Sequence, residues 1–168
     1  EGEWLLSAQQ EVQEVRFDDK PMSRQFVFGI RKGIPITGDF NGDGFLDVIV
    51  AAELSHLIYL QNPGPEQARR GAAWKRLILP MTKGNGSYIR VFAADLDGDG
   101  TPEAIAANKG AQRPGPADLL RSTPVSIFSV TGNPLQDAAW KETVLGRFSV
   151  PQNAQPMDLN GDGDPAET

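Results

Sequence analysis

The chain has 168 residues, enough for one domain with a core of its own, and a formal net charge of −6. That charge argues against a general nucleic-acid-binding protein, since such proteins present a basic face. The chain has no cysteine, which excludes disulfides and thiol chemistry, and no apolar run approaches the roughly 18 residues of a membrane span. Its 18 glycines and 13 prolines favour many turns and short strands over long helices.

In chain order, the expected strands surround an acidic motif that occurs three times. The copies are DFNGDGFLD from Asp39, DLDGDGTPE from Asp95 and DLNGDGDPA from Asp158. The expected strands are short runs in which Ile, Val, Phe and Tyr dominate, and Gly, Pro, Asn and Asp bound them. The expected strands cover residues 33–39, 46–52, 56–62 and 73–79, then 88–95, 103–109, 125–131 and 139–145, and finally 153–158, before the third motif.

The spacing of the motifs predicts a repeat protein. The motifs recur after 56 and 63 residues, and the sequence AAWK also recurs, at 72–75 and 138–141. Four short antiparallel strands per repeat describe a blade of a β-propeller. We therefore expect an all-β fold, with residues 1–168 forming one repeat domain of about three partial or complete blades. The approximate units are 25–80, 81–145 and a truncated 146–168, and ring closure is expected to need further blades or other protomers.

The acidic loops predict calcium sites. Side-chain oxygens at loop positions 1, 3 and 5, a glycine at 6, a carbonyl at 7 and a carboxylate at 9 suit the six to eight oxygen ligands of calcium. The third loop has Ala166 at position 9 and Glu167 one residue later, so we expect it to bind most weakly. The candidate ligands are Asp39, Asn41, Asp43, the Phe45 carbonyl and Asp47 in the first loop; Asp95, Asp97, Asp99, the Thr101 carbonyl and Glu103 in the second; and Asp158, Asn160, Asp162 and the Asp164 carbonyl in the third.

Other interpretations of these loops fit less well. A turn rich in Asn, Asp and Gly can bind nothing, but three copies in one register favour a cation. Magnesium demands tighter octahedral geometry than such a loop provides. An EF-hand needs a Glu at position 12, where this chain has Val50 and Ala106, and it needs flanking helices, whereas β-branched residues follow the first loop.

Phe28-Gly29 and then Gly33-Ile34-Pro35 precede the first loop, and the sequence YLQNPG is followed by a Trp. With these motifs and the acidic loops, the chain resembles the FG-GAP/VCBS family of β-propeller repeats, which includes the propeller of the integrin α-subunit. The YLQNPG segment and the Trp are similar to the NPG…W blades of bacterial VCBS-type proteins. The similarity covers most of residues 25–167, and Glu103 and Ala166 depart from the family pattern at position 9. The resemblance implies that each loop joins the two inner strands of a blade, where calcium fixes the turn.

The function is less sharply indicated than the fold. We expect a calcium-stabilised module that binds proteins or carbohydrates at an extracellular, cell-surface or periplasmic location. The alternative is the propeller portion of a polysaccharide lyase or sugar dehydratase. His56, the only histidine, is interpreted as turn structure, and Trp74 and Trp140 as packing between blades. The Pro- and Gly-rich insertion 109–124 is either a recognition loop or a tolerated surface insertion.

Overall fold

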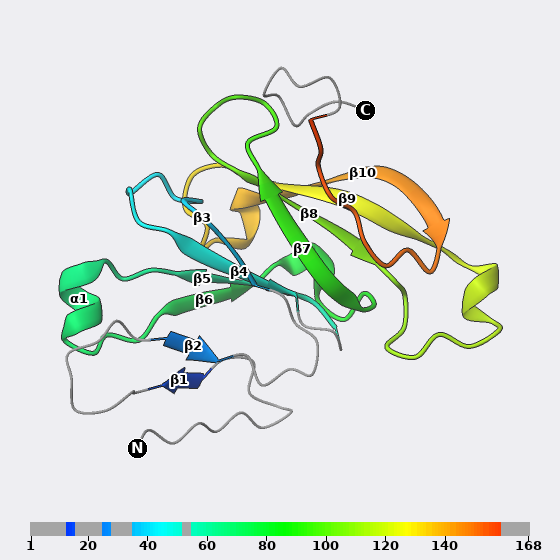
Figure 1. Cartoon of the computed structure of the whole chain (residues 1–168), viewed down its shortest axis with the longest axis horizontal. Helices are drawn as coiled ribbons and strands as arrows, with labels where there is room; N and C mark the ends of the chain where they lie inside the picture. Colours follow the sequence, from blue (N-terminus) through cyan, green and yellow to red (C-terminus); the bar gives the residue numbers. More distant parts are fainter. Residues whose placement is uncertain (1–12, 16–24, 28–34, 52–54, 159–168) are drawn as a thin grey trace.

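The computed structural model describes residues 13–15, 25–27, 35–51 and 55–158, and it contains two antiparallel four-stranded sheets (Figure 1). The first sheet has the order β3-β4-β5-β6 and the second the order β7-β8-β9-β10. The strands of the first are β3 (Pro35–Gly38), β4 (Asp47–Ala51), β5 (Leu57–Gln61) and β6 (Lys75–Ile78). Those of the second are β7 (Tyr88–Ala94), β8 (Glu103–Asn108), β9 (Ser122–Val130) and β10 (Trp140–Ser149).

Little of the described chain is helical. A two-stranded antiparallel sheet pairs β1 (Gln13–Val15) with β2 (Gln25–Val27). The one α-helix described is α1 (Pro65–Arg69), and the 3-10 helices are η1 (Pro80–Thr82), η2 (Asp118–Leu120) and η3 (Asp137–Ala139). The prediction of an all-β fold made of four-stranded antiparallel units is confirmed. The two sheets have the up-and-down strand order of propeller blades, and the described residues do not close into a ring.

One expected strand is absent. The described residues 151–158 contain no strand, although a strand was expected over 153–158. Pro151 and Pro156 each lack the backbone N–H that a sheet ladder needs, and no described strand pairs with this segment. The prediction for this segment is therefore wrong. β10 is also longer than the expected 139–145, because its pairing with β9 continues past an irregularity between Val144 and Gly146 as far as Ser149.

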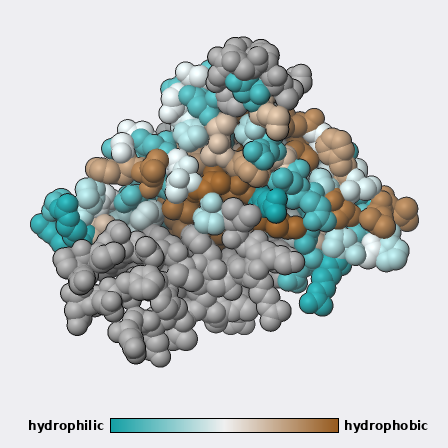
Figure 2. All heavy atoms as spheres, in the orientation of Figure 1, coloured by the Kyte–Doolittle hydropathy of each residue, from teal (hydrophilic) through white to brown (hydrophobic). Residues whose placement is uncertain are grey.

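The main core lies between the two sheets. Strands β4 and β5 contribute Ile49, Ala51, Leu57 and Tyr59, and the second sheet contributes Val91, Ala104, Ala106, Phe128 and Trp140. Strand β7 contacts β3 and β4, so the innermost strands of the sheets meet. Figure 2 shows apolar side chains in a band across the middle of the described part. Burial of the inter-sheet core residues removes apolar surface from water, which is the main force that holds the sheets together.

The first sheet is buried on both faces. Val48, Val50, Ile58 and Leu60 point away from the inter-sheet core and form a second buried cluster, against which Trp74 and Ile78 pack. This explains why β4 is apolar at successive positions instead of alternating with polar residues. Trp74 lies on this far face, whereas its repeat equivalent Trp140 lies between the sheets. The interpretation of Trp140 as inter-blade packing is confirmed.

Candidate metal centre

The first acidic loop, residues 39–47, joins β3 to β4, and its backbone N–H groups donate hydrogen bonds to its own acidic side chains. Asp39 accepts hydrogen bonds from the backbone N–H groups of Asp43 (3.1 Å) and Gly44 (2.8 Å). Asn41 Oδ1 accepts one from Asp43 N (3.0 Å), and Asp43 Oδ1 accepts one from Phe45 N (2.9 Å). The side chains at positions 1, 3 and 5 are thus held in one tight turn. Gly44 has φ 85°, a conformation that strongly favours glycine.

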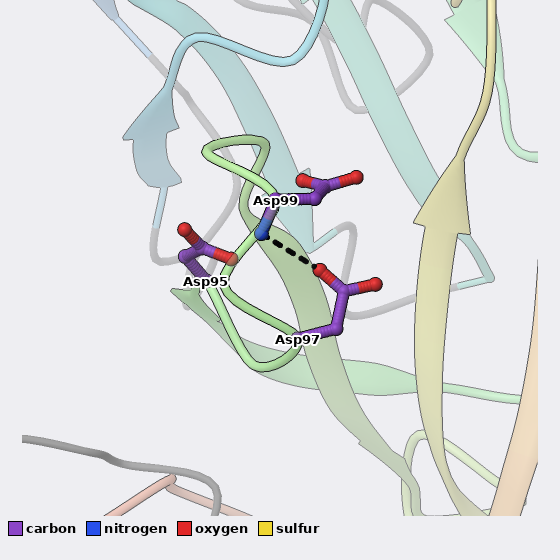
Figure 3. Close-up of side chains that lie close together, drawn as sticks. All are labelled: Asp95, Asp97 and Asp99. Carbon is purple, nitrogen blue, oxygen red and sulfur yellow. Dashed lines mark hydrogen bonds between the residues drawn. The ribbon is translucent and has the colours of Figure 1, made fainter.

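The second loop, residues 95–103, joins β7 to β8 in the same way (Figure 3). The two oxygens of Asp95 accept hydrogen bonds from Gly98 N and Gly100 N, each at 2.9 Å. Asp97 Oδ1 accepts one from Asp99 N (3.2 Å). The carboxylates of Asp95, Asp97 and Asp99 each offer an oxygen, and these oxygens lie within 4.8 Å of one another. Backbone N–H groups therefore hold the acidic side chains in a similar turn in both loops. Asn41 of the first loop takes the position that Asp97 has in the second.

The two loops lie at the same end of the molecule. A Cβ added at Gly38, just before the first loop, would be 2.7 Å from Cγ of Pro102, which lies in the second loop. The Pro102 ring therefore packs directly on the Gly38 backbone, and only glycine leaves room for it. The repeat places equivalent loops side by side where the innermost strands of the two sheets meet.

The carboxylates at position 9 lie beneath the loops. Asp47 is fully buried; its Oδ2 accepts a hydrogen bond from the Tyr59 hydroxyl (2.7 Å) and its Oδ1 accepts one from Asn62 N (2.8 Å). Glu103 is also buried, and its Oε2 accepts a hydrogen bond from Leu96 N (2.8 Å). Each of these carboxylates ties its loop to the protein interior. Their role as cation ligands stays a prediction, as does that of the Phe45 and Thr101 carbonyls.

Burial and nearby negative charge raise the pKa values of Asp47 and Glu103. Burial is the main cause that raises the pKa of Asp47, and the nearby charges of Asp43 and Asp39 add to it, while the hydrogen bonds from Tyr59 and Asn62 oppose it. The pKa of Glu103 is raised for the same reasons, by burial and by the charges of Asp97, Asp99 and Asp95, against the hydrogen bond from Leu96. Each loop concentrates negative charge that a bound cation would offset.

The donor set fits calcium. The side chains at positions 1, 3 and 5 of both loops all offer oxygen, the ligand that hard cations prefer. The loops are exposed enough for water to complete a coordination shell. For the third loop, Asp158 is partly buried and lies outside any strand. Asn160, Asp162 and Asp164 lie outside the described residues.

Comparison with models of known protein families gives a match to the segment that contains both loops. Residues 39–106, from the first residue of the first loop to the middle of β8, match the model of the FG-GAP-like repeat. The chain carries an FG-GAP-like repeat. The matched FG-GAP-like segment contains both described loops and the strands that connect them. Comparison with curated proteins and with solved structures found no match.

Sequence reasoning missed the contacts of three residues that connect the first loop of the FG-GAP-like segment to the rest of the protein. Phe40 inserts into the inter-sheet core from the first loop, and Tyr59 and Asn62 bind Asp47. Asn62 could have been found, since Asn-Pro recurs at 133–134, but nothing in the local pattern of Phe40 or Tyr59 indicates their partners.

His56 lies at the turn before β5, where its Nδ1 contacts the Ser55 hydroxyl, in line with a structural role. Within the described part of the chain, no helix is long and apolar enough to cross a membrane.

A pH dependence follows from the raised pKa of Asp47. Between the ordinary and the raised pKa, the folded state binds more protons than the unfolded state, so stability falls as pH rises. With a chelator present, we expect the contribution of Asp47 to stability to decline as pH rises from its ordinary pKa through its raised folded-state pKa. Asp47→Asn should flatten this decline. Denaturant unfolding of both proteins from pH 4 to pH 8 measures it, and a profile that Asp47→Asn leaves unchanged would contradict the assignment.

Proposed function

We propose that this chain is a calcium-stabilised, β-propeller-like module. The observation that carries the proposal is the duplicated loop, in which backbone N–H groups hold three oxygen-bearing side chains in one turn at equivalent places of two sheets. The proposed ligands are the residues at positions 1, 3, 5, 7 and 9 of each loop, with the third loop binding most weakly. Calcium is preferred to magnesium because its shell tolerates irregular geometry and mixed carboxylate, amide and carbonyl oxygens.

We further propose that the module binds a protein or a glycan. An ordered, exposed loop between β8 and β9 supports this. Gly115 N donates to Asp118 Oδ2 (2.8 Å), Ser149 Oγ donates to the Leu119 carbonyl (2.9 Å), and Leu119 and Leu120 stay largely exposed. Loops fixed on a rigid sheet scaffold are common sites of recognition. Further blades, from this chain or from other protomers, would complete the ring.

An extracellular, cell-surface or periplasmic location is part of the proposal. Extracellular calcium modules bind the ion with dissociation constants of about 10⁻⁴–10⁻³ M, which suits structural sites filled at the calcium levels outside cells. The loops expose Asp43, Asp97 and Asp99, an arrangement that favours modest affinity. Calcium would then serve as the local cross-link in a chain that contains no cysteine.

Calorimetric titration of the full chain with calcium at neutral pH tests the proposal. Asp43→Ala and Asp99→Ala remove the position-5 ligand of the first and second loop, and each is expected to lower the number of bound ions by one. Asp137→Ala, which removes an exposed acid at η3 far from either loop in sequence, should leave the number unchanged. A folded wild-type chain that binds no calcium would refute the proposal.

A further inference from the structure

The first loop is joined to the contact between the two sheets through an aromatic cluster. Phe40, the second residue of the loop, packs edge-on against Tyr59, with ring centroids 6.2 Å apart. Both rings contact Trp140 of the second sheet, Phe40 at 6.3 Å and Tyr59 at 5.7 Å. All three side chains belong to the inter-sheet core. Aromatic pairs at such separations stabilise beyond the area that they bury.

The other end of the loop reaches the same cluster. Asp47 accepts the hydrogen bond of the Tyr59 hydroxyl at 2.7 Å, in a position without solvent exposure. A hydroxyl that donates to a carboxylate forms a strong, short hydrogen bond. The first and last parts of the loop are therefore connected to one residue, Tyr59, which itself touches the second sheet.

We propose that Asp47, Tyr59 and Phe40 couple cation binding in the first loop to the packing of the two sheets at Trp140. This rests on the proposed calcium site. A cation fixes the positions of Asp39 and Asp47 relative to each other, and these residues in turn position Phe40 and the Tyr59 hydroxyl. Coupling of this kind is reciprocal: if calcium tightens the contact at Trp140, then an intact contact tightens the binding of calcium by the same factor. Tyr59 is thus a positioning residue of the calcium site.

The second loop does not have these connections. Leu96 stands where the first loop has Phe40, and the position-9 residue Glu103 binds the backbone of Leu96 instead of a side chain of the next strand. In the strand register, Ile49 pairs with Tyr59 in the first sheet, whereas Ile105 pairs with Ile127 in the second. Ile127 has no hydroxyl. The second loop touches the first sheet through Pro102 at Gly38, a contact that does not include Trp140. We therefore expect only the first loop to report on the contact at Trp140.

The test isolates the first loop. In a background carrying Asp99→Ala and Asp162→Ala, Tyr59→Phe is expected to weaken calcium binding about tenfold, because it removes one hydrogen bond to a carboxylate and keeps the ring. Tyr88→Phe is the matched control: Tyr88 is equally buried in the same core and contacts Phe128, and its hydroxyl bonds Asn108, away from the loops. It should change the affinity less than twofold.

Tryptophan fluorescence supplies a second measurement, and it does not depend on the folding of the Tyr59 variant. In the same background, calcium should change the emission, and Trp140→Phe should abolish the change, whereas Trp74→Phe, on the far face of the first sheet, should retain it. Phe40→Leu, which copies the second loop, should reduce the change. If calcium binds and neither Tyr59→Phe nor Phe40→Leu has these effects, the coupling is refuted and the calcium site stands. If no loop of the folded chain binds calcium, both proposals fail.

Discussion

Removal of calcium is expected to lower the melting temperature of this protein by about 10–20 °C at neutral pH. A ligand that binds only the folded state stabilises it by about 2.7 kcal/mol per site at a hundredfold excess over the dissociation constant. Two independent sites would contribute about 5 kcal/mol, a large share of the stability of a typical domain. For a chain of this size, each kcal/mol corresponds to about 2–4 °C.

The measurement is thermal unfolding of metal-free and calcium-loaded protein, followed by circular dichroism. Excess calcium added after chelation should restore the higher melting temperature, and magnesium at the same concentration should restore less of it. Asp43→Ala should reduce the calcium-dependent shift by about half, and Asp162→Ala, in the loop without a position-9 acid, should reduce it least. Identical melting with and without calcium would refute a stabilising role and favour a role for the ion in binding a ligand.

Trp140→Ala is expected to lower the free energy of unfolding by about 3–5 kcal/mol. Trp140 is only 6% exposed, lies between the sheets against Phe40 and Tyr59, and donates a hydrogen bond from Nε1 to the Pro134 carbonyl (2.9 Å). Its removal leaves a cavity at the sheet contact and an unpaired buried carbonyl. Denaturant unfolding in saturating calcium measures the loss.

Leu120→Ala is the matched control, because Leu120 is 90% exposed on η2 and loses little burial when truncated. Surface substitutions of this kind change stability by less than about 0.5 kcal/mol. If Trp140→Ala is equally harmless, the two sheets do not pack through Trp140 in solution, and the aromatic cluster that links them to the first loop is absent.

Much of the fold could be predicted from local sequence. The runs around Ile49, Tyr59 and Ile127 are rich in β-branched or aromatic residues and have Gly, Pro, Asn or Asp at one end or both, which indicates strands and turns without knowledge of distant residues. The period of the acidic loops then indicated how the strands group into sheets. The expected strand at 153–158 was wrong because strand formation depends on a partner, and a local run that contains Pro156 cannot reveal whether one is available.

The site could be predicted only in part. The side chains at positions 1, 3 and 5 converge because short-range hydrogen bonds of the loop place them, and the spacing in the sequence shows this. The partners of Asp47 come from residues 12 and 15 positions later, and they depend on the register between β4 and β5. No local pattern encodes that register, so the link from the loop to Tyr59 and Trp140 emerged only from the folded structure.

A crystal structure of the full chain grown in calcium, with anomalous diffraction data, tests the central claim most directly. The account predicts one anomalous peak inside each of the two described loops, with the oxygens of Asp39, Asn41 and Asp43, or of Asp95, Asp97 and Asp99, at about 2.3–2.6 Å from the ion. Well-ordered loops without such peaks at saturating calcium would contradict it.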